Sequence, residues 1–288
     1  MLRTRLWMGA ILIALTVAVL FVDRNMAGYP FWFILVGGLS GVATFELLHL
    51  LKPEVRPPSW LCAVCVLELL LANWLPHIDP LPQIPYAAWI CIVVAFAACV
   101  LLIFVVEMAT FREPGYSVTR MALGVWLLAY VGLLPSFLAQ MRWFSGRDEE
   151  CIAALALTIF VAKCCDIGAY FTGRLIGRRQ MAPVLSPKKT WEGAIGGLAT
   201  ALLAAVALDR LGPAPLLREN SLIEIGFGFT VGVAGMLGDL AESLIKRDCR
   251  QKDASHAVPG FGGVLDVVDA ILFASPVAYV WFVALRSG

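Results

Sequence analysis

The chain has 288 residues, of which 60% are hydrophobic and only 15% are charged. A soluble domain is typically about 45–50% apolar and about 25% charged, so this composition excludes an ordinary soluble domain. The formal net charge of +1 points to no class of partner, and we expect no nucleic-acid partner.

The hydrophobic residues gather into runs long enough to cross a membrane, for which a helix needs about 20 apolar residues. The first run follows Arg3 and Arg5 and ends in Asp23-Arg24-Asn25 with no small-x-small cleavage site, so we interpret it as an uncleaved first span. The predicted fold class is all-α, a polytopic transmembrane helical bundle of about nine spans. Their approximate ranges are 5–22, 29–51, 60–76, 86–109, 119–141, 151–172, 190–209, 222–245 and 263–284.

We expect two regions, a transmembrane region of about five spans at 1–150 and a catalytic region of about four spans with basic loops at 151–288. In the second region, Gly193, Gly196 and Gly197 form a small-residue face that predicts close helix packing. The eight cysteines are expected to be free thiols, because Cys62-x-x-Cys65 has no second pair with which to form a metal site.

The distribution of basic residues predicts the orientation of the spans. With the N-terminus in the cytoplasm, 15 of the 22 lysines and arginines fall in cytoplasmic segments, six fall on the other side, and Lys163 lies within a span. The two most basic loops, 173–189 and 246–262, are then on the same face. We therefore expect a multi-pass protein of a bacterial inner membrane whose active site is on the cytoplasmic face.

Several charged residues lie inside the later spans, where such residues are costly and usually line a polar cavity. They are Lys163, Asp166, Glu192, Asp239, Glu242, Asp266 and Asp269. One reading is mutual neutralisation, which we expect for Lys163 with Asp166. The remaining acids exceed the nearby cations, and convergent carboxylates suit a hard divalent cation bound to phosphates. In the earlier spans, Glu46, Glu68 and Glu107 occur singly, which favours structural pairing or snorkelling.

The basic loops also have a plain explanation, namely membrane topology or binding of anionic lipids. Two features go beyond it. The string Ser186 to Gly193 (SPKKTWEG) suggests a turn that leads into a helix capped by Thr190, and lysines beside a helix N-terminus form an anion site. The string Pro259 to Gly263 (PGFGG) precedes Asp266, and its glycines allow backbone N–H groups to approach a phosphate.

Two blocks of motifs in residues 160–272 resemble those of the phosphatidate cytidylyltransferase (CDP-diacylglycerol synthase) family. The first block comprises Asp166, Ala169, Tyr170, Gly173, Arg174, Gly177 and Ser186 through Gly193. The second comprises Gly238, Asp239, Glu242, Ser243, Lys246, Arg247, Lys252, Asp253, Pro259, Gly262, Gly263, Asp266 and Asp269.

The chain departs from the family pattern at two positions. Phe261 stands where the family has a histidine, and Val267 stands where it has an arginine between the two aspartates. His256 lies five residues before the expected histidine and is not a simple replacement. These departures suggest that neither family side chain is the centre of the chemistry.

The resemblance implies that CTP and phosphatidic acid react to give CDP-diacylglycerol and pyrophosphate. The reaction would take place at a Mg²⁺ site of the protein, which is surrounded by membrane lipid. The resemblance assigns the metal to Asp239, Asp266 and Asp269, with Asp266 as the safest ligand and Glu242 as a weaker candidate. Lys246 is a further catalytic residue. The implied substrate-binding residues are Ser186, Lys188, Lys189, Lys246, Arg247, Lys252, Gly262 and Gly263. A monovalent cation such as K⁺ is a second cofactor that the family implies, and homodimer formation is left open.

Two other classes of function are alternatives. One is a CTP-dependent lipid kinase or a cytidylyltransferase for another lipid. The other is an ion-coupled transporter, since buried carboxylates and basic mouths also mark ion pathways. Against a transporter, the sequence has no inverted repeat, and the charges stop at one face of the membrane.

Overall fold

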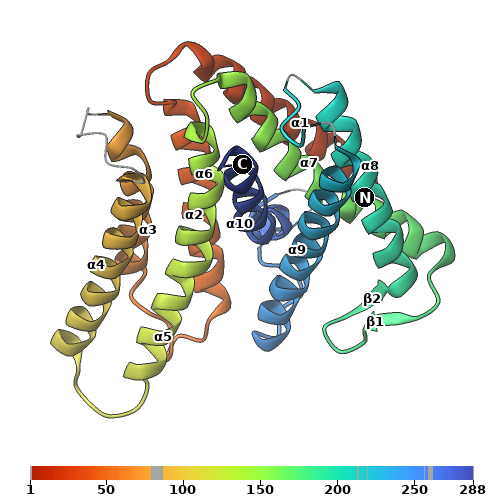
Figure 1. Cartoon of the computed structure of the whole chain (residues 1–288). Helices are drawn as coiled ribbons and strands as arrows, with labels where there is room; N and C mark the ends of the chain where they lie inside the picture. Colours follow the sequence, from red (N-terminus) through yellow and green to blue (C-terminus); the bar gives the residue numbers. More distant parts are fainter. Residues whose placement is uncertain are drawn as a thin grey trace. The chain divides into compact units, whose positions relative to one another are not determined.

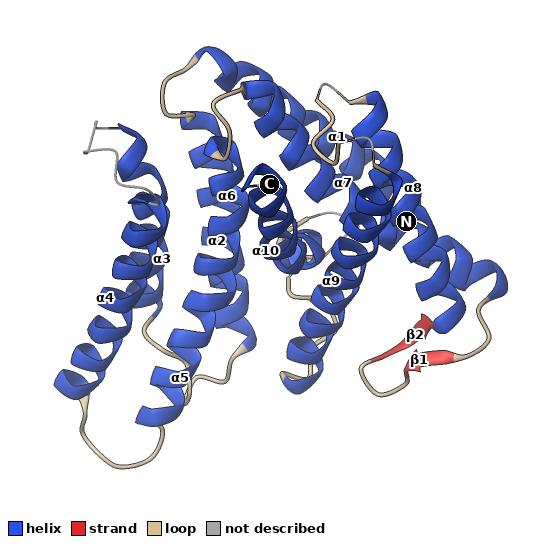
Figure 2. Ribbon diagram, viewed as in Figure 1, coloured by secondary structure: helices blue, strands red, loops and turns tan. Residues whose placement is uncertain are grey.

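The structure is a computed structural model that describes residues 2–78, 87–212, 214–218, 220–255, 257–258 and 262–287. These residues form α-helices and one two-stranded hairpin, which confirms the predicted all-α bundle (Figures 1 and 2). The first helices and turns are α1 (Leu2–Val22), η1 (Asp23–Asn25), α2 (Pro30–Leu50), α3 (Ser59–Ile78), α4 (Ala87–Thr110), α5 (Ser117–Leu127), η2 (Leu128–Leu133) and α6 (Leu134–Gln140). The later elements are η3 (Met141–Trp143), α7 (Asp148–Ile176), β1 (Gln180–Ala182), β2 (Ser186–Thr190), α8 (Trp191–Leu211), α9 (Ser221–Asp248) and α10 (Leu265–Ser287).

The described helices are long enough to cross a membrane. Eight apolar segments of 19 to 29 residues have the length and composition of spans. The 21-residue helix α1, whose second half is also apolar, precedes them. The eight segments correspond to the predicted spans from 29–51 to 263–284. The predicted first span, 5–22, falls on α1, and its crossing of the membrane stays a prediction.

The chain forms two compact units. Unit 1 comprises Met1–Gln140 and Asp253–Leu265, and unit 2 comprises Met141–Lys252 and Asp266–Gly288. The segment 253–265 therefore belongs to unit 1, although it follows α9 of unit 2 along the chain. The predicted division at residue 150 concerns where the catalytic residues lie, and it stays a prediction.

In unit 1, α2 packs against α3, and α3 packs against α4. The predicted span 119–141 is one crossing that is not a uniform α-helix, because the π-helical turn η2 separates α5 from α6. This turn brings Gly132 against α3, where a Cβ on the glycine would lie 2.8 Å from Leu69 Cδ1. A side chain at position 132 would therefore require the end of the Leu69 side chain to move.

In unit 2, α7 packs closely along α8. The close approach depends on the predicted glycine face of α8. A Cβ on Gly193 would lie 2.9 Å from the Ala169 carbonyl oxygen, and one on Gly197 would lie 2.8 Å from the Cys165 carbonyl oxygen. Small residues let helix backbones approach in lipid, and this prediction is confirmed.

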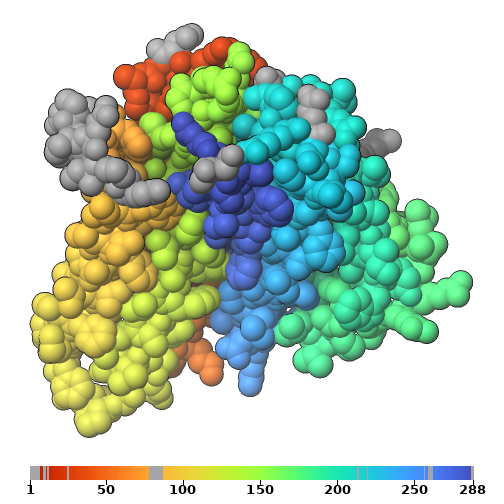
Figure 3. All heavy atoms as spheres, viewed as in Figure 1, coloured from red at the N-terminus to blue at the C-terminus, as the bar shows by residue number. Residues whose placement is uncertain are grey.

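The predicted turn before α8 is a β-hairpin in which β1 pairs antiparallel with β2. It projects at an edge of unit 2 (Figure 3). Thr190 caps α8 as predicted, because its Oγ1 accepts a hydrogen bond from the Gly193 N–H at 3.1 Å. Glu192 has a role that the sequence did not indicate. Its carboxylate accepts the backbone N–H groups of Arg178 and Arg179 at 3.0 and 3.1 Å, which fixes the start of the hairpin.

All eight cysteines are free thiols, as expected. Cys62 and Cys65 are both buried among apolar helices. In the loop after α9, burial and the neighbouring Asp248 raise the pKa of the Cys249 thiol. Because the thiolate is the reactive form, Cys249 is a poor nucleophile at neutral pH.

Candidate active site

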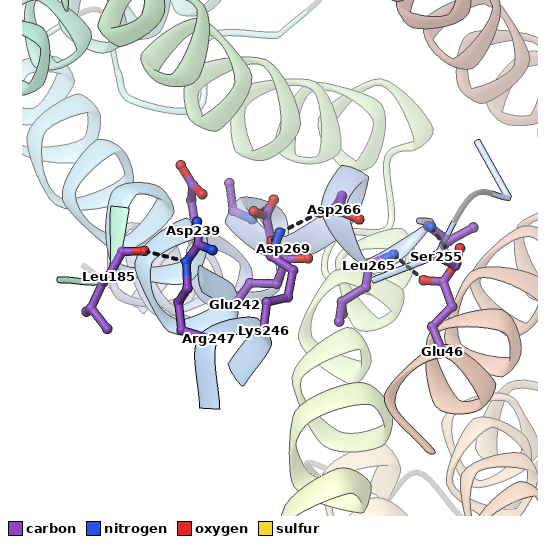
Figure 4. A network of polar contacts seen from close by, with 12 residues as sticks. Glu46, Leu185, Asp239, Glu242, Lys246, Arg247, Ser255, Leu265, Asp266 and Asp269 are labelled. Carbon is purple, nitrogen blue, oxygen red and sulfur yellow. Dashed lines mark hydrogen bonds and ion pairs between the residues drawn. The ribbon is translucent and has the colours of Figure 1, made fainter. Parts of the chain in front are cut away.

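Charged side chains from four elements of unit 2 meet near the end of α9. Helix α7 contributes Lys163 and Asp166, and strand β2 contributes Lys189. Helix α9 contributes Asp239, Glu242 and Lys246, and the first turns of α10 contribute Asp266 and Asp269. Figure 4 shows the contact between Lys246 of α9 and Asp266 of α10.

Three carboxylates form the centre of this cluster. One oxygen each from Asp239, Glu242 and Asp269 lie within 4.8 Å of one another. Asp239 and Glu242 are three residues apart and share a face of α9. Asp269 can join them because the neighbouring Gly238 has no side chain: a Cβ there would lie 2.4 Å from the Asp269 carbonyl oxygen.

Three lysines bind the edges of the carboxylate cluster. Lys246 Nζ lies 2.7 Å from Glu242 Oε2 and 2.5 Å from Asp266 Oδ1. Lys189 Nζ of the hairpin lies 2.7 Å from Asp239 Oδ2. On α7, Lys163 pairs with Asp166 at 3.1 Å, as the sequence predicted.

The same Lys163 ammonium also lies 3.7 Å from Asp269 Oδ1. The half-buried pair on α7 is therefore connected to the central carboxylates. An i,i+3 spacing could predict the first contact, but the second joins residues more than a hundred positions apart and left no signal in the sequence.

The cluster carries an excess of negative charge. Its five carboxylates, those of Asp166, Asp239, Glu242, Asp266 and Asp269, face three lysines, which leaves two formal negative charges. Glu242 is 1% exposed, and among the described residues its Oε1 has no hydrogen-bond partner. A buried carboxylate oxygen without a partner is costly, so the site fits a ligand that brings positive charge. Oxygen donors of this kind suit a hard divalent cation such as Mg²⁺.

A cavity of about 400 Å³ opens beside the cluster. Basic groups from the hairpin and from α7 line it, namely Lys188, Lys189 and Arg174, and Tyr170 and Asp239 line it as well. The cavity thus combines basic groups with a carboxylate of the central cluster. That arrangement suits an anion accompanied by a metal ion.

The remaining predicted residues are in different places. Arg247 Nε donates a hydrogen bond to the Leu185 carbonyl oxygen at 3.2 Å, which links the end of α9 to the hairpin (Figure 4). Ser186 begins β2, and Lys252 is exposed in the loop after α9.

Two predicted glycines, Gly262 and Gly263, belong to unit 1, and Gly262 adopts a positive φ of 112°. A side chain would be strained there. His256, Pro259 and Phe261 lie outside the described residues.

The predicted metal ligands fall into two groups. Asp239 and Asp269 belong to the central cluster together with Glu242, which the sequence indicated only as a weaker candidate. Asp266 forms an ion pair with Lys246. Its place among the metal ligands stays a prediction.

Comparison with known proteins adds an independent finding. A model of the cytidylyltransferase family matches residues 3–285. The chain is 30% identical to phosphatidate cytidylyltransferase of Bacillus subtilis (strain 168) over 278 residues, which cover 93% of this chain and 95% of the relative. It is 32% identical to phosphatidate cytidylyltransferase of Synechocystis over 210 residues, covering 65% and 68% of the two chains. It is also 41% identical to phosphatidate cytidylyltransferase of Haemophilus influenzae over 165 residues, covering 55% and 57%.

Proposed function

The chain belongs to the cytidylyltransferase family, and from this premise we propose that it transfers the cytidylyl group of CTP to phosphatidic acid. The products are CDP-diacylglycerol and pyrophosphate. The observation that carries the proposal is the basic cavity beside the carboxylate cluster in unit 2. It lies among the motifs that resemble those of phosphatidate cytidylyltransferases, and a relative of that name matches 93% of the chain.

The reaction needs no side-chain nucleophile. An oxygen of the phosphatidate phosphate is already anionic, and it forms the new bond to the α-phosphorus of CTP. The bond from that phosphorus to the oxygen that bridges to the β-phosphorus breaks, and pyrophosphate leaves with the electron pair. The protein must hold two polyanions in line and neutralise their charge, which is how phosphoryl-transfer sites work.

The basic side chains at the cavity supply the positioning. Lys188 and Arg174 line the cavity, and they would bind phosphate oxygens through charge-assisted hydrogen bonds. Lys189 lines the cavity and pairs with Asp239, so it would keep the triphosphate close to the carboxylates. Lys246 holds Glu242 and Asp266 in place on the other side of the cluster.

Asp239, Glu242 and Asp269 would hold Mg²⁺, with Asp266 as the further predicted ligand. When bound, the ion would supply positive charge to phosphate oxygens as negative charge shifts to the leaving pyrophosphate. The partnerless Glu242 Oε1 supports this assignment.

The cytoplasmic face of the inner membrane suits this reaction, because CTP is a cytoplasmic nucleotide and phosphatidic acid is a membrane lipid. The 15-to-6 distribution of basic residues supports this orientation, which places the C-terminus on the opposite face. Reporter fusions at the C-terminus test it, and a cytoplasmic signal there would contradict the orientation.

The decisive assay uses purified protein in detergent with CTP and Mg²⁺. We expect pyrophosphate release that depends on added phosphatidic acid, with CDP-diacylglycerol formed in equal amount. A lipid kinase would release CDP instead, and a transporter would release neither. Absence of pyrophosphate release under these conditions would overturn the proposed function.

A further inference from the structure

Glu46 of unit 1 is a buried carboxylate with an unusual set of partners. It lies on α2 and is 5% exposed. Its Oε1 accepts hydrogen bonds from Ser255 Oγ at 2.6 Å and from the Val264 N–H at 2.9 Å. Its Oε2 accepts the Leu265 N–H at 2.8 Å (Figure 4). Among the described residues, these partners are two backbone amides and a hydroxyl, with no lysine or arginine.

The position of Glu46 on its own helix is unfavourable. It lies four residues before the end of α2, where the negative end of the helix dipole disfavours a carboxylate. The same carboxylate accepts the N–H groups of Val264 and of Leu265, the first residue of α10, and negative charge is favourable at a helix N-terminus. Glu46 therefore carries a charge that its own helix disfavours. Its partner Leu265 is 219 residues later in the chain.

The capped segment leads directly into the candidate active site. Leu265 is joined by a peptide bond to Asp266, and Asp269 lies one helical turn further on. Gly263, which precedes Val264, also lies close to the Glu46 carboxylate. A Cβ on Gly263 would lie 2.6 Å from Glu46 Oε2. The backbone from 263 to 265 thus rests on Glu46, and its path sets the start of the helix that carries both aspartates.

We propose that Glu46 is a positioning residue for the reaction: its carboxylate fixes the peptide groups before Asp266 and thereby sets the place of Asp266 and Asp269. This inference rests on the proposed function, and it gives the N-terminal half a part in it. Glu46 itself touches neither substrate. It acts through the backbone of residues 263–265.

Glu46→Gln tests the inference with little change in size. Glutamine keeps one acceptor oxygen and presents an NH₂ group to a backbone N–H, so the three donors cannot all be satisfied. We expect hydrogen exchange at the Val264 and Leu265 amides to accelerate and kcat to fall at least about ten-fold, since misplacing reacting groups by about 1 Å can cost about 100-fold. We also expect a higher Mg²⁺ concentration for half-maximal rate, with less change in the KM for CTP.

Glu68→Gln is the matched control. Glu68 is another glutamate within a span of unit 1, and its Oε2 accepts a hydrogen bond from Cys99 Sγ, away from the 253–265 segment. The control should stay within about two-fold of wild type in kcat, because it removes nothing that the reaction uses. Exchange at Val264 and Leu265 should be unchanged in this variant.

A second pair of variants keeps the inference testable if Glu46→Gln does not fold. Gly263→Ala should lower kcat because its Cβ meets the carboxylate. Glu46→Asp withdraws the carboxylate by one methylene, so the Gly263→Ala, Glu46→Asp double variant should lose less than the two single losses combined. Simple additivity of the two losses would contradict the contact.

Two results would overturn the inference. One is faster amide exchange in Glu46→Gln with kcat and Mg²⁺ dependence unchanged, because Glu46 would then only stabilise the loop. The other is unchanged exchange, because the cap would then be absent in solution. Wild-type protein that forms no CDP-diacylglycerol would instead sink the proposed function, and the exchange measurement would still decide whether the cap exists.

Discussion

The two units differ in how the carboxylates inside their spans are paired with hydrogen-bond donors and cations. In unit 1, Asp23 accepts the N–H groups of Phe31 and Trp32, and Glu107 pairs with Arg120. Each of these carboxylates is matched by its own donors. In unit 2, Glu224 of α9 is likewise matched by Arg210. The five carboxylates of the cluster, in contrast, share three lysines and retain an excess of negative charge.

This difference distinguishes structural carboxylates from carboxylates that are available to bind a ligand. A carboxylate matched by local donors has little reason to bind anything else, and its removal should mainly affect stability. A cluster with surplus charge and an oxygen without a partner is incomplete until a ligand arrives. Substitutions in the two units should therefore change different measured quantities.

The largest effect is expected in the carboxylate cluster. Asp239→Asn, Asp266→Asn and Asp269→Asn should each lower kcat at least about 100-fold, because each removes charge that stabilises the transition state. The proteins should still fold and insert, since the cavity is already polar. Turnover across a magnesium titration is the measurement.

The matched control is Asp23→Asn, the same change at a fully buried aspartate of unit 1. It should lower thermal stability and leave turnover within about two-fold of wild type. Near-normal activity of a cluster variant at saturating magnesium would show that its carboxylate is not a ligand.

An intermediate effect is expected at Lys246. Lys246→Ala leaves Glu242 and Asp266 without their shared cation, so kcat should fall about 10- to 100-fold.

Arg247→Ala should also lower kcat, because it removes the hydrogen bond to the Leu185 carbonyl oxygen and loosens the hairpin. Phe261→His should change kcat by less than about three-fold, because basic residues of the same loop, such as Arg250 and Lys252, would supply the positive charge. Steady-state kinetics of the variants make the comparison.

One result would contradict the small effect expected for Phe261→His. The wild type could form no CDP-diacylglycerol while Phe261→His combined with Val267→Arg restores it. The family histidine and arginine would then carry chemistry that this chain lacks.

The smallest effect on turnover is expected at Asn73 of unit 1. Its Nδ2 donates to Ser136 Oγ at 2.9 Å, and its Oδ1 accepts from Gln140 Nε2 at 3.0 Å. Asn73→Ala should destabilise the protein by about 1 kcal/mol, in line with hydrogen bonds between membrane helices, and leave kcat nearly unchanged. Thermal unfolding in detergent and turnover are measured together. A large loss of kcat without a change in Tm would break the proposed division between the units.

The spans could be predicted from the sequence because a bilayer imposes a length on apolar runs. The expected ranges 29–51 and 190–209 correspond to α2 (Pro30–Leu50) and α8 (Trp191–Leu211). The π-helical turn at Leu128–Leu133 could not be predicted, because it replaces one helical hydrogen-bond pattern with another inside the same apolar run. The hairpin was missed because its strands are short and polar.

Site residues were predictable where their contacts are local. The pairing of Lys163 with Asp166 follows from their spacing on one helix. The contacts from Lys246 to Asp266 and from Glu46 to Leu265 join different helices, so spacing along the chain could not predict them. Glu46 did offer one hint, a carboxylate close to a helix C-terminus.

The cap that Glu46 places on α10 also has a consequence for biosynthesis. A ribosome adds about 5–20 residues per second, so Glu46 is made roughly 10 to 45 s before Leu265. During that interval the Glu46 carboxylate exists without Ser255, Val264 and Leu265. Unit 1 is completed only when segment 253–265 emerges, by which time most of the chain has been synthesised. The first spans to be inserted are therefore among the last to reach their final contacts.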